Sequence, residues 1–213
     1  MKLYTYFRSS AAFRVRIALA LKGVAVEHIP IHLRRGDQVA RDYAAVNPQR
    51  FVPALDTGTT VLTQSLAIIE YLDETVPRPP LLPPGPEGRA RVKALAQIIA
   101  CDIHPINNLK VMMYLRDVLK VADADATAWS RHWIGEGFTA LERLLAESPE
   151  TGRFCHGDSP GLADICLVPQ VYNAGRVGCP LDAYPTIRRI NAACLELEAF
   201  SGAWPDRQPD ADL

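Results

Sequence analysis

The sequence predicts a small α/β domain followed by an all-helical domain. Three observations support this prediction. Strand-like and helix-like patterns alternate over the first eighty residues, a proline-rich stretch follows, and no persuasive strand pattern appears beyond it. The 213 residues are enough for one large domain or two small ones.

The first half of the α/β domain reads as strand, helix, strand. Residues Lys2–Phe7 form a short strand pattern that ends at a polar Arg-Ser-Ser sequence. Ala11–Lys22 has helical spacing of apolar residues and is followed by Gly23, a residue that favours helix C-termini. Val26–Leu33 alternates as a second strand, whereas Arg34–Val46 has no clear pattern.

A hairpin and a helix complete the domain. Ala54–Asp56 and Val61–Thr63 flank a Thr-Gly-Thr sequence that is typical of a tight turn. Ser65 then begins another helical pattern. This order of elements predicts a small mixed sheet covered by helices.

Six prolines between Pro77 and Pro86 mark a linker. We therefore expect one domain over residues 1–80 and a second over residues 88–213. In the second domain the apolar spacing predicts helices over 88–118, interrupted near Pro105, and over 126–147, 162–177 and 186–200.

Composition excludes several classes of function. Hydrophobic residues make up 48% of the chain, charged residues 22%, and the net charge is −1, so the balance is that of a globular protein and not of a nucleic-acid binder. We find no signal sequence and no membrane-spanning run. The five cysteines are scattered and odd in number, which predicts reduced thiols and a cytoplasmic location. No histidine or cysteine spacing indicates a metal site.

The first candidate functional motif is Arg8-Ser9-Ser10, at the junction of the first strand and the first helix. A helix N-terminus presents unpaired N–H groups and partial positive charge, which stabilise a thiolate. Taken alone, two serines at such a place also fit a simple helix N-cap.

Two further motifs lie near strand ends. Val52-Pro53 at the start of a short strand allows a cis peptide, and a trans proline at an edge strand is the alternative. Gln64-Ser65 combines a side-chain amide, a hydroxyl and a helix start, a combination that suits a carboxylate, although Ser65 also fits an ordinary cap.

Together these motifs resemble the zeta class of glutathione transferases. The resemblance covers essentially the whole chain. It rests on Arg8-Ser9-Ser10-x-x-Phe13-Arg14, Asn47-Pro48, Val52-Pro53, Gln64-Ser65-Leu66-Ala67, Asp102-Ile103-His104-Pro105, Ala163-Asp164-Ile165-Cys166 and Gln208-Pro209-Asp210.

The resemblance implies a thioredoxin-like N-terminal domain that binds glutathione, a helical C-terminal domain that binds substrate, and a homodimer. By position, the implied glutathione ligands are Ser9 and Ser10 near sulfur, Gln38 and Val52 along the peptide, and Gln64 and Ser65 at the γ-glutamyl carboxylate. His104 and the Asn108-Leu109-Lys110 stretch would border the site, and Asp102 would reach the glutathione of the neighbouring subunit.

The implied activity is glutathione-dependent cis–trans isomerisation of a small maleyl keto acid. The preferred substrate is maleylpyruvate, converted to fumarylpyruvate in gentisate-type aromatic catabolism. Maleylacetoacetate isomerisation in tyrosine and phenylalanine degradation and general glutathione transfer are the alternatives. Arg8 and Arg176 are the candidate carboxylate ligands, because arginine binds a carboxylate through two parallel hydrogen bonds. His104 and Asn108 are candidate substrate donors, although a structural role fits His104 equally well.

Two departures from the family pattern carry consequences. Ala11 occupies a position where the family often has cysteine, so the attacking sulfur is expected to come from glutathione and a redox activity is disfavoured. Gly161 replaces the hydroxyl that would complete a helix N-capping box with Asp164, for which we expect a cost of about a few tenths of a kcal/mol. A non-enzymatic interaction module is the remaining alternative, and the retained serine, proline and glutamine motifs disfavour it.

Overall fold

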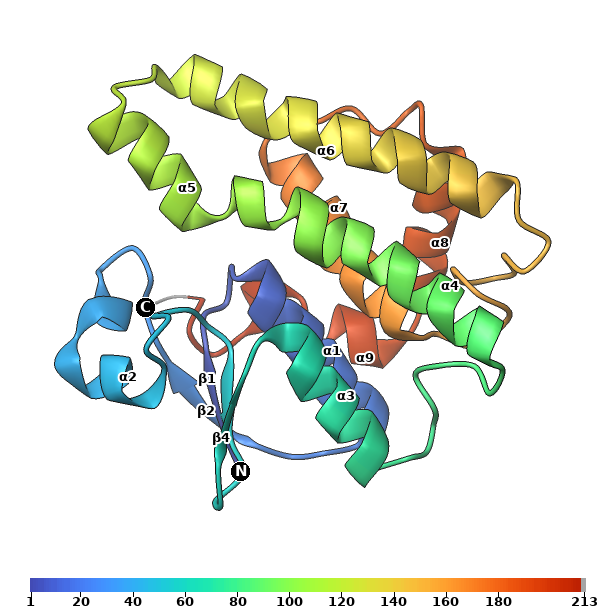
Figure 1. Ribbon diagram of the computed structural model, residues 1–213, viewed down its shortest axis with the longest axis horizontal. Coiled ribbons are helices and arrows are strands. Elements are labelled where there is room, and N and C mark those ends of the chain that lie inside the picture. The colour runs from blue at the N-terminus through green and yellow to red at the C-terminus, as the bar shows by residue number, and fades with distance from the viewer. Residues whose placement is uncertain (212–213) are drawn as a thin grey trace. The chain divides into compact units, whose positions relative to one another are not determined.

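The computed structural model describes residues 1–211, which form two compact units (Figure 1). The first unit consists of Met1–Pro80 together with the C-terminal segment from Glu196. The second consists of Leu81–Leu195. The first stretch ends at Pro80, within the proline-rich segment. The segment after Glu196, expected in the second domain, instead packs with the first unit.

A four-stranded sheet organises the first unit. Its strands are β1 (Lys2–Thr5), β2 (Glu27–Pro30), β3 (Ala54–Asp56) and β4 (Val61–Thr63). Their order is β2-β1-β3-β4; β1 pairs parallel with β2 and antiparallel with β3, which forms the predicted hairpin with β4. This is the mixed sheet that the sequence predicted.

Two helices of the first unit pack beside each other, α1 (Ser10–Lys22) and α3 (Ser65–Thr75) (Figure 1). Gly23 ends α1 as predicted, because it adopts the left-handed conformation (φ 64°) in which its N–H bonds back to the helix. The short helix α9 (Glu198–Ser201) also packs on α1.

The segment Arg34–Val46, in which the sequence shows no clear pattern, contains more secondary structure than expected. It holds a 3₁₀ turn at Asp37–Val39 and the six-residue helix α2 (Arg41–Val46). Neither has a side-chain cap, and only Tyr43 among their residues is buried. A helix of this length carries too few apolar positions to show a periodicity.

The second unit is all-helical, as predicted. Its α-helices are α4 (Pro86–Gln97), α5 (Leu109–Met113), α6 (Asp123–Ala146), α7 (Leu162–Arg176) and α8 (Pro185–Leu195). Helix α7 is the most buried of them, because its residues from Leu162 to Val171 are all buried, and it packs against α4 and α8.

Two of the predicted helices are interrupted. The helix expected over 88–118 breaks at Pro105, as predicted, into α4, α5 and a 3₁₀ turn at Pro105–Asn107. Two π-helical segments, Ile98–Ile103 and Tyr114–Val118, were not expected. The single helix expected over 186–200 is wrong, since α8 ends at Leu195 and α9 begins at Glu198 in the other unit.

The structure at the start of α7 contradicts the expectation that glycine at position 161 lowers the stability of the protein. The Asp164 carboxylate accepts a hydrogen bond from the Gly161 N–H (2.9 Å), so one half of the capping box is present. However, a Cβ at Gly161 would lie 2.8 Å from the carbonyl oxygen of Leu81, which accepts a hydrogen bond from the Leu162 N–H. Glycine is therefore required by this close backbone approach, and a hydroxyl residue would not fit without displacement.

Replacing Gly161 with serine is expected to destabilise the protein by about 1–3 kcal/mol, the usual cost of overpacking, although serine is the better N-cap residue. Gly175→Ser on the same helix is the matched control, because a Cβ at Gly175 meets no atom within 4 Å. Denaturant unfolding of the two variants measures the difference. A Gly161→Ser protein as stable as the parent would contradict the steric explanation.

Among residues 1–211, no helix combines the length and the apolar character that crossing a bilayer requires.

Candidate active site

Ser9 caps the helix that follows the first strand. Its backbone is extended (φ −71°, ψ 116°), and its Oγ accepts a hydrogen bond from the Ala12 N–H at 3.2 Å. The Ser9 N–H in turn donates to the Tyr6 carbonyl at 2.9 Å, which closes a tight turn over Tyr6–Ser9. Capping uses the oxygen of the hydroxyl only as an acceptor, so its hydrogen remains available to a bound anion.

The two adjacent serines have different environments. Ser9 is half-buried, whereas Ser10, the first residue of α1, is 9% exposed. Because a ligand reaches a half-buried hydroxyl more readily, the geometry favours Ser9 as the residue nearest to a bound thiolate.

The second motif does contain a cis peptide, between Val52 and Pro53. Two side chains hold the carbonyl of the residue before it: the Tyr43 hydroxyl (2.5 Å) and the Asn47 amide (2.8 Å) both donate to the Phe51 oxygen. The Val52 side chain belongs to a buried cluster with Tyr6, Phe7, Ile31 and Tyr43. The Val52 loop and the turn before Ser9 thus share one packed core.

Replacing Tyr43 with phenylalanine is expected to cost about 1 kcal/mol at neutral pH, the usual value of one hydrogen bond. Burial raises the pKa of Tyr43 to about 12. Because the folded state favours the neutral phenol, its contribution is complete below the unfolded pKa of about 10 and is lost as the pH rises towards 12. The difference in free energy of unfolding between wild type and Y43F should therefore shrink over this interval. A difference in free energy of unfolding that does not change with pH would contradict a raised pKa for Tyr43.

The third motif lies at the start of α3. Gln64 adopts an unusual backbone conformation for a non-glycine residue (φ 69°, ψ 118°), and its side-chain amide donates to the Gln49 side chain at 2.8 Å. The buried Ser65 hydroxyl accepts a hydrogen bond from Arg14 at 3.3 Å. A guanidinium and a helix N-terminus therefore meet at Ser65, an arrangement that attracts a carboxylate.

Gln38 lies in the 3₁₀ turn at Asp37–Val39 and is half-buried. Within the described residues, its Oε1 atom is buried and has no hydrogen-bond partner. A buried amide oxygen without a donor is uncommon in a folded protein, so a donor on a bound molecule would satisfy it.

The remaining candidates near glutathione lie in the second unit. Asp102 is exposed in the π-helical segment Ile98–Ile103, and His104 follows it, half-buried. Asn108 is the N-cap of α5: its Oδ1 accepts from the Val111 N–H (3.1 Å) and its Nδ2 donates to the Pro105 carbonyl (2.8 Å). Asn108 therefore has a local structural role, which explains a polar residue in an apolar run. Leu109 and Lys110 begin α5.

The two candidate arginines lie in different units. Arg8 is half-buried in the first unit, with its guanidinium carbon 4.9 Å from the centre of the Phe7 ring. Arg176 is the last residue of α7 in the second unit and is exposed. The first unit thus contains Ser9, Val52 and Ser65, whereas the second contains Asp102 to Lys110 and Arg176.

Sequence reasoning missed three residues that shape the first unit: Arg14, Asn47 and Asp210. Arg14 and Asn47 are 2% and 1% exposed. A signal for Arg14 was present, because apolar and small residues occupy every face of α1 and leave a charged side chain no solvent-facing side. Asp210 stood only in the Gln208-Pro209-Asp210 motif of the family resemblance, and no spacing linked it to its partner Phe7, 203 positions away.

Within residues 1–211, no group of three or more histidine, cysteine, aspartate or glutamate side chains is arranged to hold a metal ion. All five cysteines are free, and only Cys101 is exposed.

Comparison with known proteins identifies the class to which this architecture belongs. Residues 1–74 match the family model for the N-terminal domain of glutathione S-transferases. Over the full length, the chain is 51% identical to a maleylpyruvate isomerase from Ralstonia sp, covering 99% of this chain and 100% of that one. It is 49% identical to a probable maleylacetoacetate isomerase from Vibrio cholerae, covering 98% and 97% of the two chains.

Solved structures agree with this result. A bacterial maleylpyruvate isomerase described as a zeta-class glutathione transferase superposes with a TM-score of 0.98 at 51% identity, covering 99% and 100% of the two chains. A maleylacetoacetate isomerase from Methylobacterium extorquens, solved with bound malonate and glutathione, gives 0.96 at 44% identity over 99% of both chains. This chain belongs to the zeta class of the glutathione transferase family, and the fold implied by the sequence resemblance is confirmed.

Proposed function

We propose that this chain is a glutathione-dependent cis–trans isomerase that converts maleylpyruvate to fumarylpyruvate in gentisate-type aromatic catabolism. The observation that carries the proposal is Ser9 at the start of α1, in a chain that matches maleyl keto acid isomerases over its whole length. Ala11, two residues further on, provides no nucleophile. The turn at the start of α1 therefore contains no thiol of its own, and the sulfur would come from glutathione.

The residues of the first unit fit glutathione chemically. Ser9 and the helix N-terminus would hold the sulfur, with Ser10 behind it in the first turn. Val52 and the buried oxygen of Gln38 would take the peptide backbone, and Gln64 with Ser65 the γ-glutamyl carboxylate. When bound, glutathione would supply a thiolate whose addition to the conjugated double bond permits rotation and whose expulsion restores the double bond and regenerates glutathione.

The polypeptide itself would stabilise charge. The Ser9 hydroxyl donates to the anionic sulfur, and α1 adds its partial positive charge. Arg8 and Arg176 would each bind a carboxylate of the maleyl keto acid, and His104 and Asn108 would orient it. Malonate bound in the Methylobacterium relative supports a dicarboxylate as the substrate class. Leu109, Lys110 and Asp102 would border the glutathione, Asp102 from the neighbouring subunit of a homodimer.

Replacing Arg176 with alanine is expected to raise KM for the diacid about tenfold or more while glutathione affinity stays nearly unchanged, because a bidentate charged contact is lost. Arg143→Ala, at an exposed arginine near the end of α6, is the matched control and should leave KM as it is. Steady-state kinetics measure both. An unchanged KM in R176A would remove Arg176 from the substrate site.

Maleylacetoacetate is the second candidate substrate, favoured by the 49% identity to the probable Vibrio isomerase. Ultraviolet monitoring of both substrates, with and without glutathione, separates the candidates. We expect the higher kcat/KM for maleylpyruvate and no turnover of either substrate without a thiol. Full activity after removal of all free thiols would overturn the proposal.

We also propose a cytoplasmic homodimer. Five free cysteines suit a reducing compartment. Sedimentation at working enzyme concentration tests the dimer: a monomer with full activity would contradict it, and with it the role of Asp102 across subunits.

A further inference from the structure

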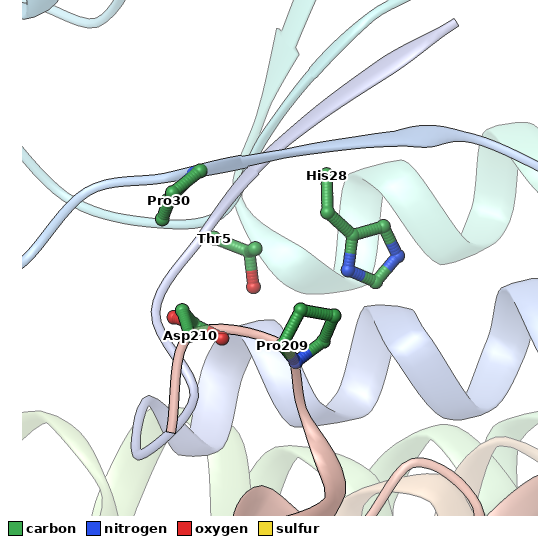
Figure 2. Close-up of a pocket in the computed structure, with 5 residues that line it drawn as sticks. All are labelled: Thr5, His28, Pro30, Pro209 and Asp210. Carbon is green, nitrogen blue, oxygen red and sulfur yellow. The ribbon is translucent and has the colours of Figure 1, made fainter. Parts of the chain in front are cut away.

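The C-terminal segment of the chain lies against the sheet of the first unit. A small pocket there is lined by Thr5 of β1, His28 and Pro30 of β2, and Pro209 and Asp210 of the C-terminal segment (Figure 2). Several contacts fix this segment in place. Trp204 packs edge-on against Phe13 of α1, and the Gln208 amide donates to the carbonyls of Gly202 and Trp204.

Asp210 contacts the backbone just before Ser9. Its Oδ2 accepts a hydrogen bond from the Phe7 N–H at 2.8 Å, and the side chain is 6% exposed. Phe7 is the second residue of the turn that the Ser9 N–H closes onto the Tyr6 carbonyl. An amide at that position points out of the turn and has no partner within it, so Asp210 satisfies a donor that burial would otherwise leave unpaired.

Arg16 binds the carbonyl groups of the same turn. Its guanidinium, buried on α1, donates to the carbonyls of Phe7 (3.0 Å) and Tyr6 (3.4 Å) and to the Thr5 hydroxyl (3.3 Å). It also donates twice to the Ala203 carbonyl, at 3.3 Å, in the C-terminal segment. The N–H and the C=O of Phe7 are thus each fixed by a buried charged side chain of opposite sign.

We infer that Asp210 is a positioning residue for Ser9: by accepting the Phe7 N–H it sets the turn that places the Ser9 hydroxyl and the start of α1 against the sulfur of glutathione. The inference rests on the proposed role of Ser9. The neighbouring residue Ala211 packs against the cluster that contains Tyr6, Phe7 and Val52, so the segment supports the second glutathione motif as well.

The turn requires the hydrogen-bond acceptor of Asp210 and not its negative charge. A carboxylate beside the turn that carries Ser9 would, by itself, disfavour a thiolate there. Arg16 of α1 is the charged group that binds the same turn, and His28 of β2 lines the same pocket with its pKa lowered by burial. An uncharged acceptor of the same shape should therefore preserve the function, whereas loss of the acceptor should not.

The test compares Asp210→Ala, Asp210→Asn and the control Asp206→Ala, an exposed carboxylate four residues earlier in the same segment. The readout is the ultraviolet absorbance of the glutathione thiolate bound to each protein at saturating glutathione, followed against pH, together with glutathione affinity. We expect D210A to raise the apparent thiol pKa by about one unit and to weaken glutathione binding about tenfold, the loss expected when a buried N–H group loses its acceptor. D210N and D206A should lie close to wild type.

The outcomes separate the inference from the proposed function. If wild type itself does not ionise bound glutathione, the proposed function fails. If wild type does so and folded D210A titrates identically, the inference about Asp210 is overturned, and the same holds if D210N behaves like D210A. Should D210A not fold, Asp210→Glu, with its carboxylate displaced by one methylene, takes its place: a raised thiol pKa supports the inference, and an unchanged one overturns it.

Discussion

Replacing Ser9 with alanine is expected to lower kcat/KM for maleylpyruvate by about 10²–10³-fold, the usual effect of removing one hydrogen-bond donor from a developing or bound anion. The Ser9 hydroxyl is the half-buried one of the pair, and capping of α1 uses it only as an acceptor. Steady-state kinetics at saturating glutathione measure the effect, and the pH profile should shift to higher pH as the thiol becomes less acidic.

The same change removes the N-cap of α1, which costs about 1 kcal/mol, so stability and catalysis must be separated. Ser9→Gly does this, because glycine at an N-cap costs only about a few tenths of a kcal/mol relative to serine and has no side-chain donor. We expect S9G to stay close to wild type in stability and to lose activity as S9A does. Ser10→Ala, at the buried neighbour, should have the smaller kinetic effect. A fully active S9A enzyme would refute the role of Ser9.

Replacing Asp164 with asparagine is expected to destabilise the protein by about 3 kcal/mol. Asp164 is 1% exposed in the first turn of α7, and its two oxygens accept the N–H groups of Cys155 and Gly161, each at 2.9 Å. Burial raises the pKa of Asp164, and the backbone amides oppose that rise. An asparagine must turn its NH₂ group towards one of these donors, which leaves buried donors facing each other.

The control for Asp164 lies in the loop that precedes α7. Asp158 also accepts a backbone N–H, from Arg153 at 3.0 Å, but it is exposed. Asp158→Asn should therefore cost less than about 1 kcal/mol, because water replaces the lost acceptor. Denaturant unfolding compares the two variants, with the m-value (the dependence of the unfolding free energy on denaturant concentration) determined for each. Equal losses in both variants would show that burial does not set the cost.

The sequence predicted those elements whose ends carry a local chemical signal. The hairpin strands β3 and β4 have the predicted bounds because Thr57–Thr59 marks the turn between them. Helix α7 ends within one residue of expectation, since the glycine at its start and the polar residues at its end interrupt a continuous apolar run. Pro105 likewise marked a real break.

Elements defined by tertiary contacts were missed. The break between α8 and α9 falls at Glu196-Leu197, where no proline or glycine signals it, because the chain there passes from one unit to the other. The start of α8, by contrast, was predicted to within one residue, at 186 against Pro185. The Glu142 carboxylate of α6 also accepts the N–H groups of Thr186 and Ile187 at 2.8 and 2.9 Å, a tertiary contact that adds to this local signal.

In the candidate site, too, positions with a local sequence signal were predicted and those set by tertiary contacts were not. Ser9, Val52 and Gln64 stood at strand ends and helix starts, where sequence patterns point to function. The residues that hold those positions, such as Asn47 at the Phe51 carbonyl, act through contacts that spacing does not encode.

The discontinuous first unit has a consequence for the order in which the protein matures during synthesis. A ribosome translates Met1–Pro80 first, but the partners that Phe7 and Arg16 bind, Asp210 and Ala203, are translated only after the whole Leu81–Leu195 unit. The uninterrupted Leu81–Leu195 unit is therefore complete in the nascent chain before the unit that precedes it. The turn that carries Ser9 acquires its full set of contacts only after that second unit has been synthesised.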